Sequence, residues 1–321
     1  MRVLNLVRPS GPTGGDIGYA VDYANALQGL NADIQVDVRP ANELDGLDDY
    51  DFIHMWAACS PDWGLEAARA ARQSKAQFIL SPIWWPRDAR QAFYGMPGID
   101  IAPGYKQSVA AIINMADVLA CFTMSELVEC WKLVPNANGV VMGIGIDRRA
   151  QKAQPPDDYV LSIGRIERHK NQLWLAVACR MNGYPLKCAG FIRDEAYAEA
   201  VKQQGAEILG EIPHDDLIDK YLARARVHAL PSFGEVVSRS NCEAYDLGIP
   251  SVISLEGADP EYFGDWGYYC RPEDWRSIQE ALRRAWFGKR LNWGNIIHPT
   301  WVDVARNMYI RMREWNESPF V

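Results

Sequence analysis

Two basic and two acidic side chains stand at spacings that could let them act on one ligand. Arg165 and Lys170 lie five positions apart in "GRIERHKN", directly after an apolar run, and seven residues separate Glu235 from Glu243. A guanidinium and an ammonium in one turn can hold two neighbouring phosphates, and carboxylates accept hydrogen bonds from vicinal hydroxyls. Spacing alone leaves a second interpretation open, in which the two cations only form a solvated face.

Short apolar runs that alternate with helical stretches must position these side chains. Strands are predicted in "RVLNLV", "YDFIHMW", "AQFILSPIW", "DVLACF", "GVVMGIGID", "YVLSIGRI", "LKCAGF", "AEILGEI", "VHALPS" and "PSVIS". A helix is predicted in "SNCEAYDLG", which puts Glu235 in the loop at its entrance and Glu243 in its first turns. This rhythm predicts an α/β fold with doubly wound, mainly parallel sheets.

The polar, proline-bearing segment "RRAQKAQPPDD" interrupts the alternation at 148–158 and indicates a linker. We therefore expect two Rossmann-like domains, 1–150 and 151–298, facing across a cleft. Ligands of such domains bind at the carboxyl ends of the strands. Each domain opens with a strand, a glycine-containing turn and a helix, at "TGGDIG" and "GRIERHKN". Helix amino ends attract anions, so Gly14, Gly15 and Gly164 are candidates for phosphate binding, although tight turns also need glycine for backbone reasons.

Composition excludes several classes of protein. With 48% hydrophobic and 23% charged residues, the chain has no run long enough for a membrane helix, and its first residues do not read as a signal peptide. We expect a cytoplasmic protein.

The 7 cysteines lack metal-site or disulfide spacing, and Cys121, Cys179 and Cys188 read as core residues. A net charge of -8 argues against a nucleic-acid partner, and acidic residues outnumber basic ones before the linker, which leaves at most peripheral membrane contact.

The second half of the chain resembles the nucleotide-binding half of glycosyltransferase family 4, whose members are retaining sugar transferases with the two-domain GT-B fold. The resemblance rests on four motifs in order, from about Tyr159 to Trp286: "GRIERHKN", "LGEIPHDDLIDKYLARARVHALPS", Glu235 to Glu243 followed by "AYDLGIPSVIS", and "GADPEYFGDWGYYCRPED". The first half is similar in outline only. The segment "PTWVDVARNMYIRMREW" is similar to the family's last helix, which implies a helix at about 299–316 that packs back onto the first domain.

The resemblance implies a role for each site residue. Arg165 and Lys170 match the cations on the donor diphosphate, Glu235 the carboxylate on the donor sugar, and Glu243 the carboxylate on the ribose. Both cations also count as catalytic, because they neutralise charge that grows on the departing diphosphate. The remaining donor-binding candidates are the first-domain glycines Gly14 and Gly15, the turn residue Gly164, the base-packing residue Ile212, and Val237, Ser238, Arg239 and Ser240 between the two glutamates.

This sequence departs from the family pattern at several points. Where the family carries a glycine soon after the first glutamate, the chain reads "EVVSRSNCE". Arg239 could add a third cation at the phosphates or project into solvent. His54 keeps the first of two family histidines and is the candidate for a catalytic base, with a buried core residue as the alternative. The second histidine position is Trp56.

Further candidates are aromatic or acidic. Four tryptophans are concentrated in the first domain: Trp56, Trp63, Trp84 and Trp85. Trp56 is expected to pack in the core, whereas Trp84 and Trp85 suit either packing or stacking on a sugar ring. His228 is expected to be buried. The string Asp49 to Asp51 reads as a solvated turn, and we predict no metal requirement.

The expected activity is transfer of a hexose or related sugar, with retention, from a UDP- or GDP-linked donor to a hydroxyl of a saccharide or glycan acceptor, and no further cofactor. The first domain would hold the acceptor and the second the donor. Two alternatives stay open: an epimerase or phosphorylase on the same fold, and a non-catalytic subunit that binds sugar nucleotides.

Overall fold

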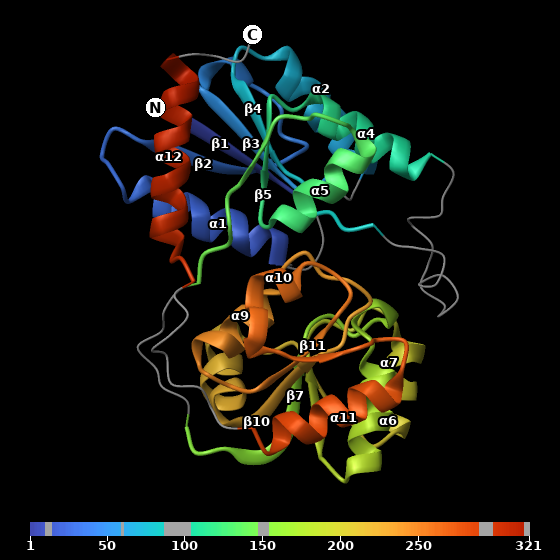
Figure 1. Ribbon diagram of the computed structural model, residues 1–321. Coiled ribbons are helices and arrows are strands. Elements are labelled where there is room, and N and C mark those ends of the chain that lie inside the picture. The colour runs from blue at the N-terminus through green and yellow to red at the C-terminus, as the bar shows by residue number, and fades with distance from the viewer. Residues whose placement is uncertain (10–14, 59–60, 87–103, 147–153, 289–297, 318–321) are drawn as a thin grey trace. The chain divides into compact units, whose positions relative to one another are not determined.

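The computed structural model describes residues 1–9, 15–58, 61–86, 104–146, 154–288 and 298–317 (Figure 1). They form two compact units: the first contains Met1–Pro86, Gly98–Ile146 and His298–Val321, and the second contains Asp147–Ile297. Each unit is built on one parallel sheet with helices on both faces, so the predicted fold class of two doubly wound α/β domains is confirmed. Most of the predicted linker lies outside the described residues.

The sheet of the first unit has the order β2-β1-β3-β4-β5-β6 in the described part of the chain. Its strands are β1 (Arg2–Val7), β2 (Gln35–Pro40), β3 (Phe52–Trp56), β4 (Gln77–Ser81), β5 (Val118–Cys121) and β6 (Gly139–Val141). Its helices are α1 (Gly15–Gln28), α2 (Pro61–Gln73), α4 (Tyr105–Met115), α5 (Met124–Leu133) and α12 (Trp301–Glu317).

The sheet of the second unit has the order β12-β11-β10-β7-β8-β9 among the described residues. Its strands are β7 (Asp157–Ile163), β8 (Leu186–Ala189), β9 (Glu207–Gly210), β10 (Ala225–Leu230), β11 (Ser251–Ser254) and β12 (Tyr268–Cys270). Its helices are α6 (Gln172–Asn182), α7 (Glu195–Gln203), α8 (His214–Asp216), α9 (Arg239–Asp246), α10 (Asp259–Phe263) and α11 (Trp275–Trp286).

Central strands carry near-continuous apolar runs because helices cover both faces of a parallel sheet. Every residue of β3 and of β5 is buried, and Cys121, Cys179 and Cys188 lie in the cores, as expected. The sequence did not predict β2 and β12. Each is an edge strand in which most residues are exposed or only partly buried, so neither has the apolar run by which the other strands were recognised.

The last helix, α12, belongs to the first unit, where it packs beside α1 (Figure 1). Ile146 donates its N–H to Pro299 O at 3.0 Å, which ties the start of this segment to the chain beyond β6. Gly145 allows the approach, since a Cβ there would lie 2.5 Å from Trp301 Cα. The predicted helix at about 299–316 therefore exists and returns to the first domain.

Candidate functional site

The loops that follow β7 and β10 carry the charged site of the second unit. The two strands are parallel neighbours, so their carboxyl ends meet at one edge of the sheet. Asn171 joins the loops by donating from Nδ2 to Pro231 O at 3.0 Å and to Pro272 O at 2.8 Å. Phe233 N also donates to His169 O at 3.0 Å. These bonds bring residues 165–170 beside residues 231–235 although 60 or so positions separate them.

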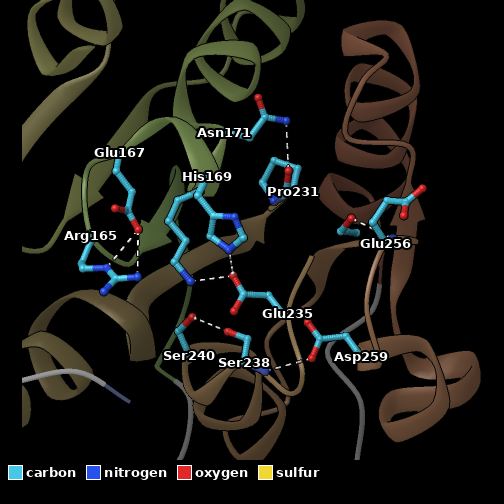
Figure 2. Close-up of polar contacts among 12 residues, drawn as sticks. Arg165, Glu167, His169, Asn171, Pro231, Glu235, Ser238, Ser240, Glu256 and Asp259 are labelled. Atoms are coloured by element: carbon cyan, nitrogen blue, oxygen red, sulfur yellow. Dashed lines mark hydrogen bonds and ion pairs between the residues drawn. The ribbon is translucent and has the colours of Figure 1, made fainter. Parts of the chain in front are cut away.

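Lys170 and Glu235 form an ion pair at this edge. Lys170 Nζ lies 2.5 Å from Glu235 Oε1, and both side chains are nearly buried. His169 Nε2 lies 3.7 Å from the same oxygen (Figure 2). Burial acts to raise the pKa of Glu235, but the charges of Lys170 and His169 and the hydrogen bond from Lys170 outweigh it and lower the pKa to about 2. Glu235 is therefore a carboxylate at any physiological pH.

Arg165 lies at the same edge and is oriented by Glu167 (Figure 2). Its Nε lies 3.0 Å and its Nη2 2.9 Å from Glu167 Oε1, and Arg193 approaches the other oxygen of Glu167 at 3.6 Å. Gln172 Nε2 donates to Arg165 O at 2.7 Å. Because a guanidinium has five N–H donors, this pairing fixes the Arg165 fork and still leaves donors for an anion.

Helix α9 begins at the same place. Ser238 is its N-cap, with Oγ accepting from Asn241 N, and Ser240 Oγ donates to Ile163 O at 3.1 Å, which ties the helix start to the end of β7. The sequence placed this helix within two residues of its start. Val237 is buried in the preceding loop.

Glu243 faces two nitrogens. His214 Nε2 lies 2.6 Å and Arg239 Nε 3.1 Å from Glu243 Oε1. Burial acts to raise the pKa of Glu243, but the hydrogen bond and charge of His214, with Arg239, lower it. Arg239 Nε therefore pairs with the second glutamate, and a role of Arg239 at the phosphates stays a prediction. Ile212 is half-buried just before His214.

The first-unit candidates lie apart from this cluster in the sequence. Gly15 is the first residue of α1, and Gly14 lies outside the described residues. His54 is fully buried, with Nε2 2.8 Å from Ser81 Oγ and its ring stacked on Trp56. Burial lowers its pKa to about 3, so it stays neutral. These contacts favour the core alternative for His54.

The tryptophans of the first unit mostly pack. Trp56 is fully buried and donates from Nε1 to Asn5 Oδ1 at 2.9 Å, as expected for a core residue. Trp63 packs partly buried against the core. Trp84 is 3% exposed, which favours packing for it, whereas Trp85 is half-buried. His228 is buried, as expected, and burial lowers its pKa to about 4.

Sequence reasoning missed four polar partners: Glu167, His169, His214 and Asp259. Glu167 and His169 stand inside the quoted motif "GRIERHKN", so their nearness to Arg165 and Lys170 was a usable signal. His214 is the first residue of α8 and Asp259 the first residue of α10, and only the fold brings them to the site. Asp49 and Asp51 lie at the turn before β3, where Asp51 accepts from Arg2 N at 2.7 Å. Among the described residues, no group of three or more His, Cys, Asp or Glu side chains could hold a metal ion.

Comparison with known proteins finds similarity in the part of the chain that carries this cluster. Residues 157–286 match the family model described as "Glycosyl transferases group 1". The match begins at the first residue of β7 and ends at the last residue of α11, so it covers the unit that carries the charged site. The part of the chain that showed the resemblance is thus similar to glycosyl transferases group 1.

One curated relative is the O-antigen chain mannosyltransferase B of Escherichia coli, which is 33% identical over 138 residues. The alignment covers 39% of this chain and 35% of the relative, so it spans about a third of that protein. No helix in the described part of the chain is long and apolar enough to cross a bilayer.

Solved structures are similar over nearly the whole chain. Sucrose-phosphate synthase from Thermosynechococcus elongatus has a TM-score of 0.71 at 16% identity, covering 99% of this chain and 96% of that chain. Anabaena HepE in complex with UDP and glucose has a TM-score of 0.70 at 16% identity, covering 97% and 94%. The lipopolysaccharide outer core galactosyltransferase WaaB has a TM-score of 0.67 at 12% identity, covering 99% of both chains. The fold is that of GT-B glycosyltransferases.

Proposed function

We propose that this protein is a retaining glycosyltransferase of family 4 that moves a hexose or related sugar from a nucleoside diphosphate onto a hydroxyl of a saccharide or glycan. The observation that carries the proposal is the cluster of Arg165, Lys170 and Glu235. It lies where the carboxyl ends of β7 and β10 meet, in the part of the chain that is similar to glycosyl transferases group 1. The mannosyl- and galactosyltransferases among the similar proteins, and the UDP and glucose of HepE, support this substrate class.

In the proposal the second unit binds the donor. Arg165 and Lys170 hold the diphosphate through N–H donors that their carboxylate partners leave available. Glu235, ionised by its pairing with Lys170, accepts hydrogen bonds from hydroxyls of the transferred sugar. Glu243 accepts from the ribose, Ile212 contacts the base, Gly164 lines the phosphates, and the backbone of 237–240 lines the donor sugar. Gly14 and Gly15 remain predicted contacts of the donor, and the first unit is proposed to bind the acceptor.

The chemical step exchanges one C1–O bond for another. The bond from C1 of the sugar to the phosphate oxygen breaks, a bond from C1 to the acceptor oxygen forms, and the acceptor proton passes to the leaving phosphate oxygen. Negative charge grows on the diphosphate as it departs, and the two cations stabilise that charge more in the transition state than in the ground state. The proposed route uses no metal ion and no side-chain base, since His54 is fully buried and cannot reach an acceptor hydroxyl.

The test is a donor screen followed by product analysis. Thermal shift with UDP, GDP and ADP identifies the nucleotide, because a bound ligand stabilises the fold by mass action. The matching sugar donors are then incubated with saccharide acceptors, and NMR of the product assigns the new anomeric centre. Retention with release of nucleoside diphosphate is expected. Inversion would exclude the retaining mechanism, and conversion of the donor without acceptor would indicate an epimerase.

A further inference from the structure

The loop that carries Glu235 is held from one side by Gly257, Ala258 and Asp259, which we name the 257–259 segment. Ala258 N donates to Glu235 O at 2.8 Å, and Glu235 and Gly257 form a parallel bridge. Gly257 has φ +116°, and a Cβ there would meet Glu235 O at 2.2 Å. The backbone of the segment therefore lies directly against the backbone of Glu235.

Asp259 extends this contact to the start of α9. Its Oδ1 accepts from Ser238 N at 2.9 Å and its Oδ2 accepts from Asn241 Nδ2 at 2.8 Å. Asp259 is 1% exposed, Asn241 is fully buried, and Ser238 is buried as well. A buried carboxyl that accepts two N–H groups from one loop limits how that loop can move, since each lost bond would leave a buried polar atom without a partner.

Asp259 also faces the charged cluster. Burial and the charge of Glu235 raise its pKa to about 7, against the opposing effects of the Ser238 and Asn241 bonds and of Lys170. Glu235, in contact with Lys170, keeps its charge. Of these two carboxyls, Glu235 is thus the ionised one available to a ligand, while both oxygens of Asp259 are engaged by the protein.

We propose that Asp259 is a positioning residue for the donor sugar: by binding Ser238 N and Asn241 Nδ2 it fixes the loop 235–238, and with it the Glu235 carboxylate, where the transferred sugar needs it. The proposal rests on the proposed function, in which Glu235 meets only the sugar. Glycine is usual after the first glutamate in the family that this chain resembles, whereas here valine, valine and serine follow it. The two bonds from Asp259 hold this different loop.

The experiment compares Asp259→Ala, Asp259→Asn and the control Asp274→Ala. Asp274 also accepts a backbone N–H at a helix start, from Arg276 at 2.9 Å, but serves α11. For each folded variant, calorimetry with UDP and GDP gives nucleotide affinity, and kinetics with UDP-glucose and GDP-mannose give kcat for sugar release to water or acceptor. Thermal unfolding gives the folded fraction.

We expect Asp259→Ala to lower kcat roughly tenfold or more and to change nucleoside diphosphate affinity by less than about threefold, since one or two buried hydrogen bonds to the sugar-side loop are lost. Asp259→Asn should recover most of the activity, because the amide accepts from Ser238 N and can donate to Asn241 once that amide turns over. Asp274→Ala should retain wild-type kcat.

If Asp259→Ala does not fold, Asn241→Ala removes one of the two bonds from the other side and is expected to show the same split between kcat and nucleotide affinity. Three outcomes overturn the proposal: unchanged kcat per folded molecule, equal loss of nucleotide affinity and kcat, or failure of both alanine variants to fold. A wild-type chain that neither binds these nucleotides nor consumes these donors would instead refute the proposed function itself.

Discussion

Two glutamates near the carboxyl ends of parallel strands differ in what surrounds them: Glu126 in the first unit, which is buried, and Glu235 in the second, which is partly buried. Glu126, in the first turn of α5, accepts from Phe122 N at 2.7 Å and Trp84 N at 3.2 Å. Burial raises its pKa to about 7, and these backbone bonds only partly oppose the rise. Glu235 contacts Lys170, and its pKa is lowered to about 2.

The difference teaches that burial does not decide the charge of such a carboxyl; the partner does. A full cation at 2.5 Å outweighs desolvation, whereas neutral N–H dipoles do not. The edge that carries Glu235 is accordingly built from ionised groups that suit phosphates and hydroxyls. The edge near Glu126 is built from neutral contacts, such as His54 with Ser81 and Trp56 with Asn5, that stabilise the fold.

Removing the cation from the charged edge should have the largest effect. Lys170→Ala is expected to lower kcat for sugar transfer about 10²–10³-fold, the usual loss when one preorganised donor to developing charge is removed. Release of nucleoside diphosphate measures the rate. Lys187→Ala removes another cation of the same unit, paired with Glu207 at 3.3 Å on β8 and β9, and should leave the rate unchanged. Equal rates for the two variants would contradict the assignment of Lys170.

Glu126 should make the protein less stable as pH rises. Its pKa is about 7 in the folded state against 4.5 without perturbation, so the stabilisation is complete below pH 4.5 and is lost as pH rises through 7. The shift corresponds to about 3 kcal/mol of unfolding free energy. Urea unfolding between these pH values should show a larger fall in the wild type than in Glu126→Gln, where the part due to Asp259, whose pKa is also raised to about 7, remains. The same slope in both proteins would show that Glu126 is already ionised.

Glu235 should act in the opposite direction. Its folded pKa of about 2 lies below 4.5, so its stabilisation is present above pH 4.5 and is lost as pH falls toward 2. Its size is again about 3 kcal/mol as an upper bound, because the side chain keeps some contact with water. Acid unfolding of Glu235→Gln between pH 5 and 3 should be flatter than that of the wild type. If instead the stability of Glu126→Gln depended less on pH in that range, Glu126 rather than Glu235 would be the carboxyl with the lowered pKa.

Glu243 and its partner His214 give a smaller, binding-specific effect. Glu243→Ala should weaken binding of the nucleoside diphosphate by about 1–3 kcal/mol whether or not a sugar is attached, because hydrogen bonds to the ribose are lost. His214→Ala should weaken it less, since Arg239 still holds Glu243. Calorimetry with nucleotide and with sugar nucleotide measures both. If Glu243→Ala weakened binding of the sugar nucleotide alone, Glu243 would contact the donor sugar and not the ribose.

The smallest effect on kcat is expected at His54, in the first unit. His54→Gln should change kcat by less than about tenfold, whereas loss of a general base costs about 10²–10⁴. Its melting temperature should fall, because the fully buried ring packs on Trp56 and meets Ser81. A larger loss of kcat in protein that remains folded would restore His54 as a catalytic residue.

Much of the fold was predictable because central strands and amphipathic helices leave local patterns. The apolar runs located β1, β3, β4 and the strands around Arg165 and Glu235, and the motifs named the cations and carboxylates before any contact was known. The edge strands β2 and β12 left no such pattern, because half-exposed edges do not select for apolar residues. Which side chains meet was not predictable, since hydrogen-bond partners such as Asp259 and Ser238 stand 21 positions apart.

The sequence by itself determined the class of the fold, the order of its elements and the chemical types present at the site, because periodicity and short motifs are local properties of the chain. Only the tertiary structure decided the state of those groups. It paired Lys170 with Glu235, gave Glu167 to Arg165, placed His214 on Glu243, and buried His54 beneath Trp56. Charge state and orientation depend on the dielectric and on neighbours within a few ångströms, and parallel strands bring such neighbours together from distant parts of the chain.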